Sequence, residues 1–184
     1  MGLLKPGINE VIATTTRNAA PIGIYFRDNR AYMILFRGSH TFENIQRDGW
    51  VVANFVQDPR IYVRTAFEDL PPESFIDETI EDLKMQRLGG ADAWAAFTAT
   101  IEKTGSESMV IALSLRKEII ENLVFHPVNR GFGNIIDATV HATRYKENRD
   151  PVLKQLIDHH AGIIRKCGGN RELEALDLLM GYIA

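Results

Sequence analysis

Hydrophobic and polar residues alternate along the first part of the chain in a pattern typical of β-strands. The alternating segments are residues 8–16, 19–26 and 30–37, and each is rich in β-branched and aromatic side chains. Short polar pairs at residues 17–18 and 28–29 separate them. The pattern therefore predicts three strands joined by two tight antiparallel hairpins.

The alternation stops at Gly38 and gives way to a short helical pattern. Residues 41–49 are long enough for about two helical turns, and a further strand is expected at residues 50–56. Thr41 is a good cap for this helix because its hydroxyl can accept a hydrogen bond from an N–H of the first turn. Glu43 places a carboxylate in the same turn, where the helix dipole favours negative charge.

An acidic stretch follows. Residues 68–82 contain seven acidic residues and no basic one, interrupted by a Leu-Pro-Pro sequence. We expect a surface loop that leads into a solvent-exposed helix at about residues 76–85. A solvent-exposed face is the usual meaning of such a run, and a surface for a basic protein partner is the alternative.

Two more strand patterns complete the first two thirds of the chain. They lie at residues 94–101 and 109–115, with a turn sequence at residues 104–106 between them. At least six strands are then expected without regular strand–helix alternation. A closed or nearly closed barrel over residues 1–120, with the acidic loop and helix inserted at about residues 68–85, explains this better than a parallel sheet.

The last third has helical periodicity. Amphipathic helices are expected at residues 129–145 and 150–166, and a third helix is expected after the Gly-Gly pair, capped by Asn170. We expect residues 121–184 to be a helical elaboration that packs on the barrel, so that the chain forms a single compact unit.

A polar stripe runs along the first of these helices. It consists of residues at helical spacing, namely Arg130, Asn134, Asp137, His141 and Arg144. One interpretation is a solvated face with a weak Asp–His pair. The other places Arg130 toward a ligand, because an arginine at a helix N-terminus is unfavourable for the dipole and calls for an anionic or acceptor neighbour.

Composition excludes several classes of protein. The 184 residues carry a net charge of −3 and have no apolar run long enough to span a membrane, so neither a nucleic-acid nor a membrane partner is expected. The chain start has no long apolar core of a signal peptide, and the single cysteine, Cys167, cannot pair within the chain. We therefore expect a cytoplasmic protein.

The sequence lacks the strong catalytic and metal-binding motifs. It has no nucleophile elbow, P-loop, dinucleotide-binding glycine motif, C-x-x-C or H-E-x-x-H. The neighbours His159 and His160 would point about 100° apart on a helix, which makes a poor chelate. No metal site is expected, and no catalytic residue can be assigned.

The segment from Phe36 to Asn44 has the chemistry of a phosphate site. It combines an arginine, a glycine, two hydroxyls, an imidazole and a helix N-terminus within nine residues. Gly38 lets the backbone approach an anion, and Arg37 can clamp two oxygens. A capped helix with a solvated arginine is the alternative from the residues alone. In the same way, Gly23 either tolerates a bulky neighbour or lets a flat ring lie against the strand.

Several sequence blocks together resemble the flavin-binding split-barrel superfamily, which includes flavin reductases and pyridoxamine-phosphate-oxidase-like proteins. The blocks are NEVIATT, NAAPIGI, and LFRGSHTFENI followed by WVVANF. With NRGFGNIIDATVHATR at residues 129–144, they are similar to an uncharacterised archaeal and bacterial family within that superfamily. The resemblance spans nearly the whole chain.

The resemblance implies a mainly β fold with C-terminal helices, built on a six-stranded Greek-key split barrel. It also implies a homodimer with FMN bound noncovalently at the interface. Residues 18–23 would line the isoalloxazine ring, and the segment after residue 36 would surround the phosphate. The residues expected to bind the cofactor are Asn18, Ala20, Pro21, Gly23, Arg37, Gly38, Ser39, His40, Thr41, Asn44 and Arg130.

The function that follows is that of an FMN-dependent oxidoreductase, similar to flavin reductases, with a small-molecule electron donor and acceptor. FMN would supply the chemistry, so no protein acid or base is required. A non-catalytic flavin-binding or flavin-sensing dimer is the alternative, because the sequence carries no nicotinamide fingerprint.

Overall fold

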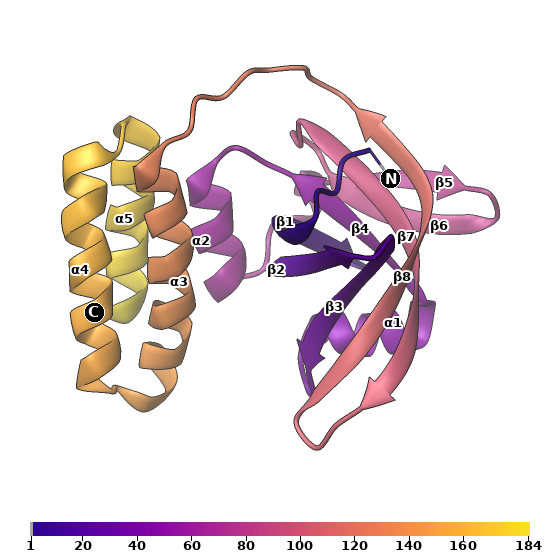
Figure 1. The fold of residues 1–184 in the computed structure, drawn as a ribbon, viewed down its shortest axis with the longest axis horizontal. Coiled ribbons are helices and arrows are strands. Elements are labelled where there is room, and N and C mark those ends of the chain that lie inside the picture. The colour runs from indigo at the N-terminus through magenta and orange to yellow at the C-terminus, as the bar shows by residue number, and fades with distance from the viewer. Residues whose placement is uncertain (1) are drawn as a thin grey trace. The chain divides into compact units, whose positions relative to one another are not determined.

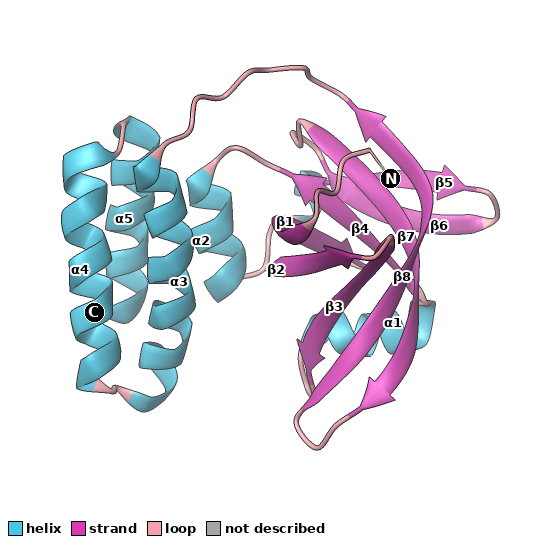
Figure 2. Ribbon diagram, viewed as in Figure 1, coloured by secondary structure: helices cyan, strands magenta, loops and turns pink. Residues whose placement is uncertain are grey.

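The computed structural model describes residues 2–184, apart from the side chain of Thr104. The chain forms two compact units, one running up to Val56 and continuing at Leu70–Val124, the other made of Gln57–Asp69 and Phe125–Ala184. Figure 1 follows the chain through its elements, and Figure 2 distinguishes the strands of the first unit from the helices, which include α1 of the first unit and all the helices of the second. That the helices pack on the barrel stays a prediction.

The first unit is a closed antiparallel barrel, and the expected fold class is confirmed. Its strands are β1 (Gly7–Thr15), β2 (Asn18–Arg27), β3 (Arg30–Phe36), β4 (Trp50–Phe55), β7 (Ala93–Thr104) and β8 (Ser108–Ile120). They follow the order β1-β2-β3-β8-β7-β4, and β4 closes the barrel on β1. The chain passes from β3 across the barrel to β4 before β7 and β8 fill the space between them, which is a Greek-key path.

Alternation and turn chemistry explain these strands. On β3, Ala31, Met33 and Leu35 are buried in the barrel core, and the residues between them face outward. Asp28 and Asn29 both have positive φ angles, of 50° and 61°, as a two-residue hairpin of the primed type requires. Both expected hairpins are therefore present.

The prediction of a loop and a helix for the acidic stretch is wrong. Residues 75–88 form a second sheet, the hairpin of β5 (Phe75–Ile80) and β6 (Leu83–Leu88), after a short 3-10 turn at Pro72–Ser74. Ile80 and Met85 are buried against Trp50 and Trp94 of the barrel wall. This burial fixes the strand conformation of β6, whose residues have good helix propensity, and of β5, whose residues favour strands.

The acidic side chains of the hairpin have partners within the unit. Glu78 pairs with Arg87 at 2.8 Å, and Asp77 accepts a hydrogen bond from Gln86 at 2.8 Å. Glu81 lies 3.8 Å from Arg116 of β8. Part of the acidic run is thus engaged in local contacts.

A buried amide and hydroxyl hold this hairpin on the barrel. Asn54 Nδ2 donates to the Ile12 carbonyl at 2.8 Å and to Thr14 Oγ1 at 3.0 Å, and Asn54 Oδ1 accepts from the Leu88 N–H at 2.8 Å. Thr14 Oγ1 donates to the Gln86 carbonyl at 2.6 Å. We call Thr14 and Asn54, both fully buried, the core cluster.

Strands β2 and β3 of the barrel pair over only part of their length. These strands pair only where residues 25–27 meet residues 30–32, whereas β2 pairs with β1 back to Asn18 and β3 pairs with β8 as far as Phe36. Helix α1 (His40–Asp48) follows β3 and contacts both β2 and β3. The edge of β2 over residues 18–24 thus has no strand partner on its β3 side among the described residues.

The second unit consists of helices. They are α2 (Pro59–Phe67), α3 (Arg130–Asn148), α4 (Pro151–Cys167) and α5 (Asn170–Ile183), which share one apolar core. The three C-terminal helices are confirmed, with Gly169 rather than Asn170 at the cap of the last. Helix α2 was not expected, and it groups with them rather than with the barrel. Within residues 2–184, no helix has the length and apolar character needed to cross a bilayer.

Candidate cofactor site

The expected ring-binding block lies along the unpaired edge of β2. Asn18 is buried, and Ala20, Pro21 and Gly23 are half-buried. An unpaired strand edge presents backbone N–H and C=O groups that a polar heterocycle can use. The structure thus leaves this block able to make backbone hydrogen bonds to a flat ligand.

Close packing against β1 explains why residue 23 is a glycine. A Cβ at this position would lie 2.8 Å from Ile8 Cγ2 and 3.4 Å from Glu10 Oε1, both on the neighbouring strand β1. The close approach of Ile8 therefore explains the glycine without a ligand, which supports the first of the two interpretations of Gly23.

The expected phosphate segment forms the turn between β3 and α1. Gly38 has a φ angle of 78°, a left-handed conformation that favours glycine, and an added Cβ would have no neighbour within 4 Å. A glycine is thus favoured at position 38 by the backbone conformation and not by a lack of space for a side chain. Arg37 is exposed, and its guanidinium lies 3.4 Å from the Gly105 carbonyl.

Ser39, not Thr41, caps α1. Ser39 Oγ accepts from the Phe42 N–H at 3.3 Å and donates to the Phe36 carbonyl at 2.9 Å. The helix begins two residues earlier than expected, so Thr41 lies within its first turn beside Glu43. The N–H groups that open a helix lack intrahelical acceptors, and here they belong to the segment that carries Arg37.

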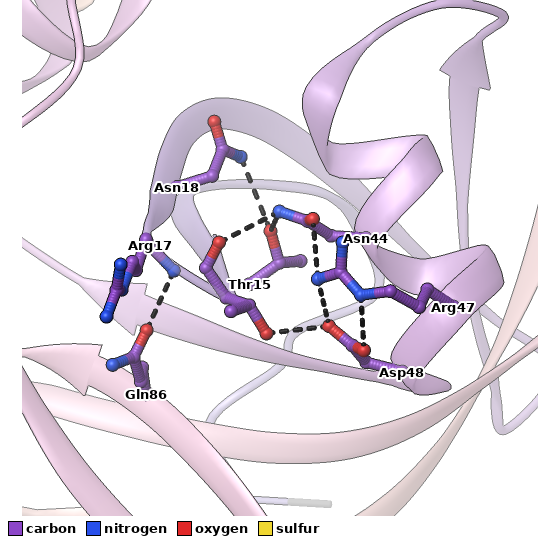
Figure 3. Close-up of polar contacts among 8 residues, drawn as sticks. Thr15, Arg17, Asn18, Asn44, Arg47, Asp48 and Gln86 are labelled. Carbon is purple, nitrogen blue, oxygen red and sulfur yellow. Dashed lines mark hydrogen bonds and ion pairs between the residues drawn. The ribbon is translucent and has the colours of Figure 1, made fainter.

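A group of hydroxyls and amides fastens α1 to the turn between β1 and β2 (Figure 3). Asn18 Nδ2 donates to Thr41 Oγ1 at 3.0 Å. Asn44 Nδ2 donates to Thr15 Oγ1 and to the Thr16 carbonyl, each at 3.0 Å. We call Thr15, Thr16, Asn18, Thr41 and Asn44 the rim cluster. It spans the gap between the unpaired edge of β2 and the helix.

The C-terminal end of α1 carries an ion pair that extends the rim cluster. Arg47 binds Asp48 with contacts of 2.8 and 2.6 Å and also donates to Asn44 Oδ1 at 2.9 Å. Thr16 Oγ1 donates to Asp48 Oδ2 at 2.6 Å. The Arg47 hydrogen bond, assisted by that of Thr16, holds the pKa of Asp48 below its ordinary value.

The polar barrel residues expected to bind the cofactor therefore divide into two groups. Asn18, Thr41 and Asn44 already satisfy one another or the β1–β2 turn, and they position the helix. Exposed groups remain at Arg37, Gly38 and His40, where a guanidinium, a left-handed backbone position and the start of α1 follow one another. This donor set is entirely cationic or N–H in character, so it fits a phosphate group.

Sequence reasoning missed Thr15, Thr16 and Gln86. Gln86 Oε1 accepts from the Arg17 N–H at 2.7 Å and so ties the β1–β2 turn to β6. The run of three threonines before a turn was a signal for local hydrogen bonding. Nothing pointed to Gln86, because its strand was expected to be a helix.

Arg130 belongs to the second unit, where it is the first residue of α3 and is exposed. The rest of its stripe is only partly solvated. Asn134 Nδ2 donates to the Arg130 carbonyl at 2.8 Å, and Asn134 Oδ1 lies 2.7 Å from His160 Nδ1 of α4. The His141 ring stacks on His160 with 5.5 Å between centroids. The stripe thus contributes to helix packing.

Comparison with protein families identifies both parts of the chain. A model described as the N-terminal domain of a protein of unknown function, DUF447, matches residues 9–122, and a second DUF447 model matches residues 129–181. An uncharacterized protein of Methanocaldococcus jannaschii is 29% identical over 193 residues, covering 94% of this chain and 96% of the relative. The resemblance to an uncharacterised family is confirmed.

Solved structures extend this comparison. An FMN-bound protein of the same family from Methanosarcina mazei is 37% identical, with a TM-score of 0.91 and coverage of 97% of this chain and 96% of that one. An FMN-binding protein from Thermus thermophilus shares the fold, with a TM-score of 0.51 and 11% identity over 65% of this chain and 73% of that one. FMN, the cofactor expected from the sequence, is thus bound by a family member.

Proposed function

Because the chain belongs to the DUF447 family of proteins of unknown function, we propose that it binds FMN noncovalently and acts as a flavin-dependent oxidoreductase on a small-molecule acceptor. One observation carries this proposal. The Methanosarcina mazei relative, which is FMN-bound, matches this chain over nearly its whole length. We place the protein in the cytoplasm, a reducing compartment that suits a single cysteine, Cys167, without a disulfide partner in the chain.

The residues of the barrel suit each part of the cofactor. Arg37, Ser39 and the start of α1 would hold the phosphate through charge-assisted and backbone hydrogen bonds. The unpaired edge of β2 would hold the ring, with the rim cluster keeping α1 at a fixed distance from that edge. When bound, FMN supplies the hydride and electron transfer, so this chain has to bind, orient and shield the ring.

We further propose a homodimer that covers the flavin from the second side. Ile34 and Phe36 project from the outer face of β3 with 41% and 64% exposure, directly before the phosphate segment. Exposed apolar side chains beside a candidate ligand site are typical of an interface. Light scattering should report about twice the chain mass, and Ile34→Glu should shift the protein toward the monomer. A wild-type monomer that binds flavin stoichiometrically would contradict the dimer.

Arg130 is proposed as a cofactor or substrate contact from the second unit. An arginine at the first position of α3 opposes the helix dipole, and an anionic neighbour would compensate for this. The matched pair is Arg130→Ala and Arg144→Ala, which remove the same charge from the same helix. We expect only Arg130→Ala to weaken flavin binding or turnover. Wild-type values for both variants would remove Arg130 from the site.

Binding and turnover test the main proposal separately. The purified protein should be yellow or become so on adding FMN, and flavin fluorescence should show FMN binding at least about tenfold tighter than riboflavin, since riboflavin lacks the phosphate. Absence of flavin binding would refute the proposal. Anaerobic assays with reduced nicotinamides and a panel of acceptors then test catalysis. Tight FMN binding without reduction by any donor would support the non-catalytic alternative.

A further inference from the structure

A cleft on the outer face of the barrel shares no lining residue with the phosphate segment. It has a volume of about 330 Å³ and is formed by the β2–β3 turn together with β3, β7 and β8. Arg27, Arg30 and Lys103 line it, along with Tyr32 and Val110. This volume is at the lower end of the range for small-molecule sites, which suits part of a nucleotide-sized ligand.

The charges in the cleft leave cationic groups available. Arg30 forms an ion pair with Glu102 at 2.6 Å, which neutralises one carboxylate of the lining. Within residues 2–184, neither Arg27 nor Lys103 has a carboxylate in ion-pair distance, and Asp28 is the remaining acidic group of the lining. The cleft therefore carries one net positive charge, with two unpaired cations.

The floor of the cleft is aromatic and held in place. Tyr32 stacks on Tyr25 of the neighbouring strand, with ring centroids 4.9 Å apart and an interplanar angle of 11°. The Arg27 guanidinium lies 6.0 Å from the Tyr25 ring centroid. A tyrosine held by stacking beside two cations without a carboxylate partner is a combination that suits an aromatic ring bearing a phosphate.

We propose that this cleft is a second ligand site, which binds a nucleoside phosphate with its base against Tyr32 and its phosphate toward Arg27 and Lys103. The two anion sites use different groups, because none of the residues that line the cleft belongs to the Arg37 segment. The sites are neighbours on one side, since Lys103 is two residues before Gly105, whose carbonyl the Arg37 guanidinium contacts. The proposal does not depend on flavin binding.

Equilibrium binding with AMP, adenosine and inorganic phosphate tests the site at low salt. AMP should bind more tightly than either of the other two, because only AMP offers both the ring and the phosphate. Arg27→Gln and Lys103→Gln should each weaken AMP binding about fivefold. Arg116→Gln, which removes an exposed arginine elsewhere on β8, should leave AMP binding unchanged.

The competing outcomes are distinct. Equal affinities for AMP and inorganic phosphate would indicate general charge attraction and overturn the proposal. Loss of AMP binding in Arg37→Gln with retention in Arg27→Gln would place AMP at the phosphate segment and overturn it too. FMN titrations in the same variants separate the two sites, since Arg27→Gln should leave the FMN affinity unchanged. If FMN displaces AMP and Arg27→Gln weakens both, the cleft is part of the flavin site.

Discussion

The core cluster and the rim cluster use the same chemistry in different surroundings. Both start from threonines at the end of β1, and both use an asparagine amide to fasten a neighbouring element, β6 in one case and α1 in the other. Asn54 is fully buried, whereas Asn44 is half-buried and shares its oxygen with the exposed Arg47.

This difference in burial decides how each cluster responds to the loss of a hydrogen-bond partner. Water cannot replace a lost partner in the core cluster, so its hydrogen bonds are needed for folding. Water can reach parts of the rim cluster, so its hydrogen bonds chiefly decide where α1 and the phosphate segment lie. The two clusters therefore differ in what they hold: the core cluster joins β6 to the barrel wall, and the rim cluster sets the position of α1.

Removal of the core amide should have the largest effect. Asn54→Ala strips partners from the Leu88 N–H and Thr14 and leaves a small cavity, so the free energy of unfolding should fall by about 2–4 kcal/mol. Thermal and urea denaturation measure this change. Asn122→Ala, at an exposed asparagine, should stay within about 0.5 kcal/mol of wild type. A similar decrease in the free energy of unfolding in both variants would show that the core cluster contributes no more to stability than an exposed asparagine.

The matching change in the rim cluster should cost less stability. Asn44→Ala loses contacts to Thr15, Thr16 and Arg47 at a site that water reaches, so we expect a loss of about 1.5–2 kcal/mol. FMN affinity should also fall, because α1 is no longer fixed against β2. Gln46→Ala on the same helix is the control. If Asn44→Ala destabilises the protein as much as Asn54→Ala, the contrast between the clusters is wrong.

Arg37→Ala should affect binding without affecting folding. The side chain is exposed, so the free energy of unfolding should change by less than about 0.5 kcal/mol. Loss of a charge-assisted contact to phosphate should raise the FMN dissociation constant about tenfold, equivalent to about 1.4 kcal/mol, and leave riboflavin binding nearly unchanged. Fluorescence titration of both flavins decides between these outcomes. Equal weakening for both flavins would exclude a phosphate contact.

Periodicity and turn residues made most of the fold predictable. The hairpins around residues 17–18 and 28–29 combine strong alternation with local turn signals, and local and tertiary preferences agree there. The β5–β6 hairpin was missed because the residues of β6 favour helix locally and the turn uses Glu81 at a φ angle of 54°. The strand conformation also depends on burial against Trp50 and Trp94. Such burial depends on residues distant in the sequence, so the local pattern of residues does not reveal it.

The sequence predicted which residues belong to the candidate site better than it predicted the contacts between them. The sequence identified the segment around Arg37 and its helix, but it made Thr41 the cap, which the structure assigns to Ser39. Thr41 accepts a hydrogen bond from Asn18, between β2 and α1. A contact between residues 23 positions apart depends on barrel closure. The grouping of α2 with the C-terminal helices has the same origin, although Asp58 followed by Pro59 was a usable helix-start signal.

A third amide cluster, in the helical unit, sharpens the comparison because it is incompletely satisfied. Asn134 joins His160, while the buried Nδ1 atom of His141 has no hydrogen-bond partner among the described residues. Burial is the main factor that lowers the pKa of His160, and it is assisted by His141 and His159 and opposed by Asp137. Protonation is thus less favourable in the folded protein than in the unfolded chain.

The smallest of the four effects should therefore be a pH dependence. Since the unfolded chain binds the proton more readily, stability is complete above the ordinary histidine pKa of 6.5 and decreases as the pH falls below it. His160→Gln removes the titrating group, so the Tm should decrease less between pH 7.5 and pH 5, by roughly 1–2 °C. Calorimetric scans across this range provide the measurement, with His40→Gln on the exposed start of α1 as the control. The same pH slope in His160→Gln and wild type would show that α3 and α4 accommodate the charged ring without cost.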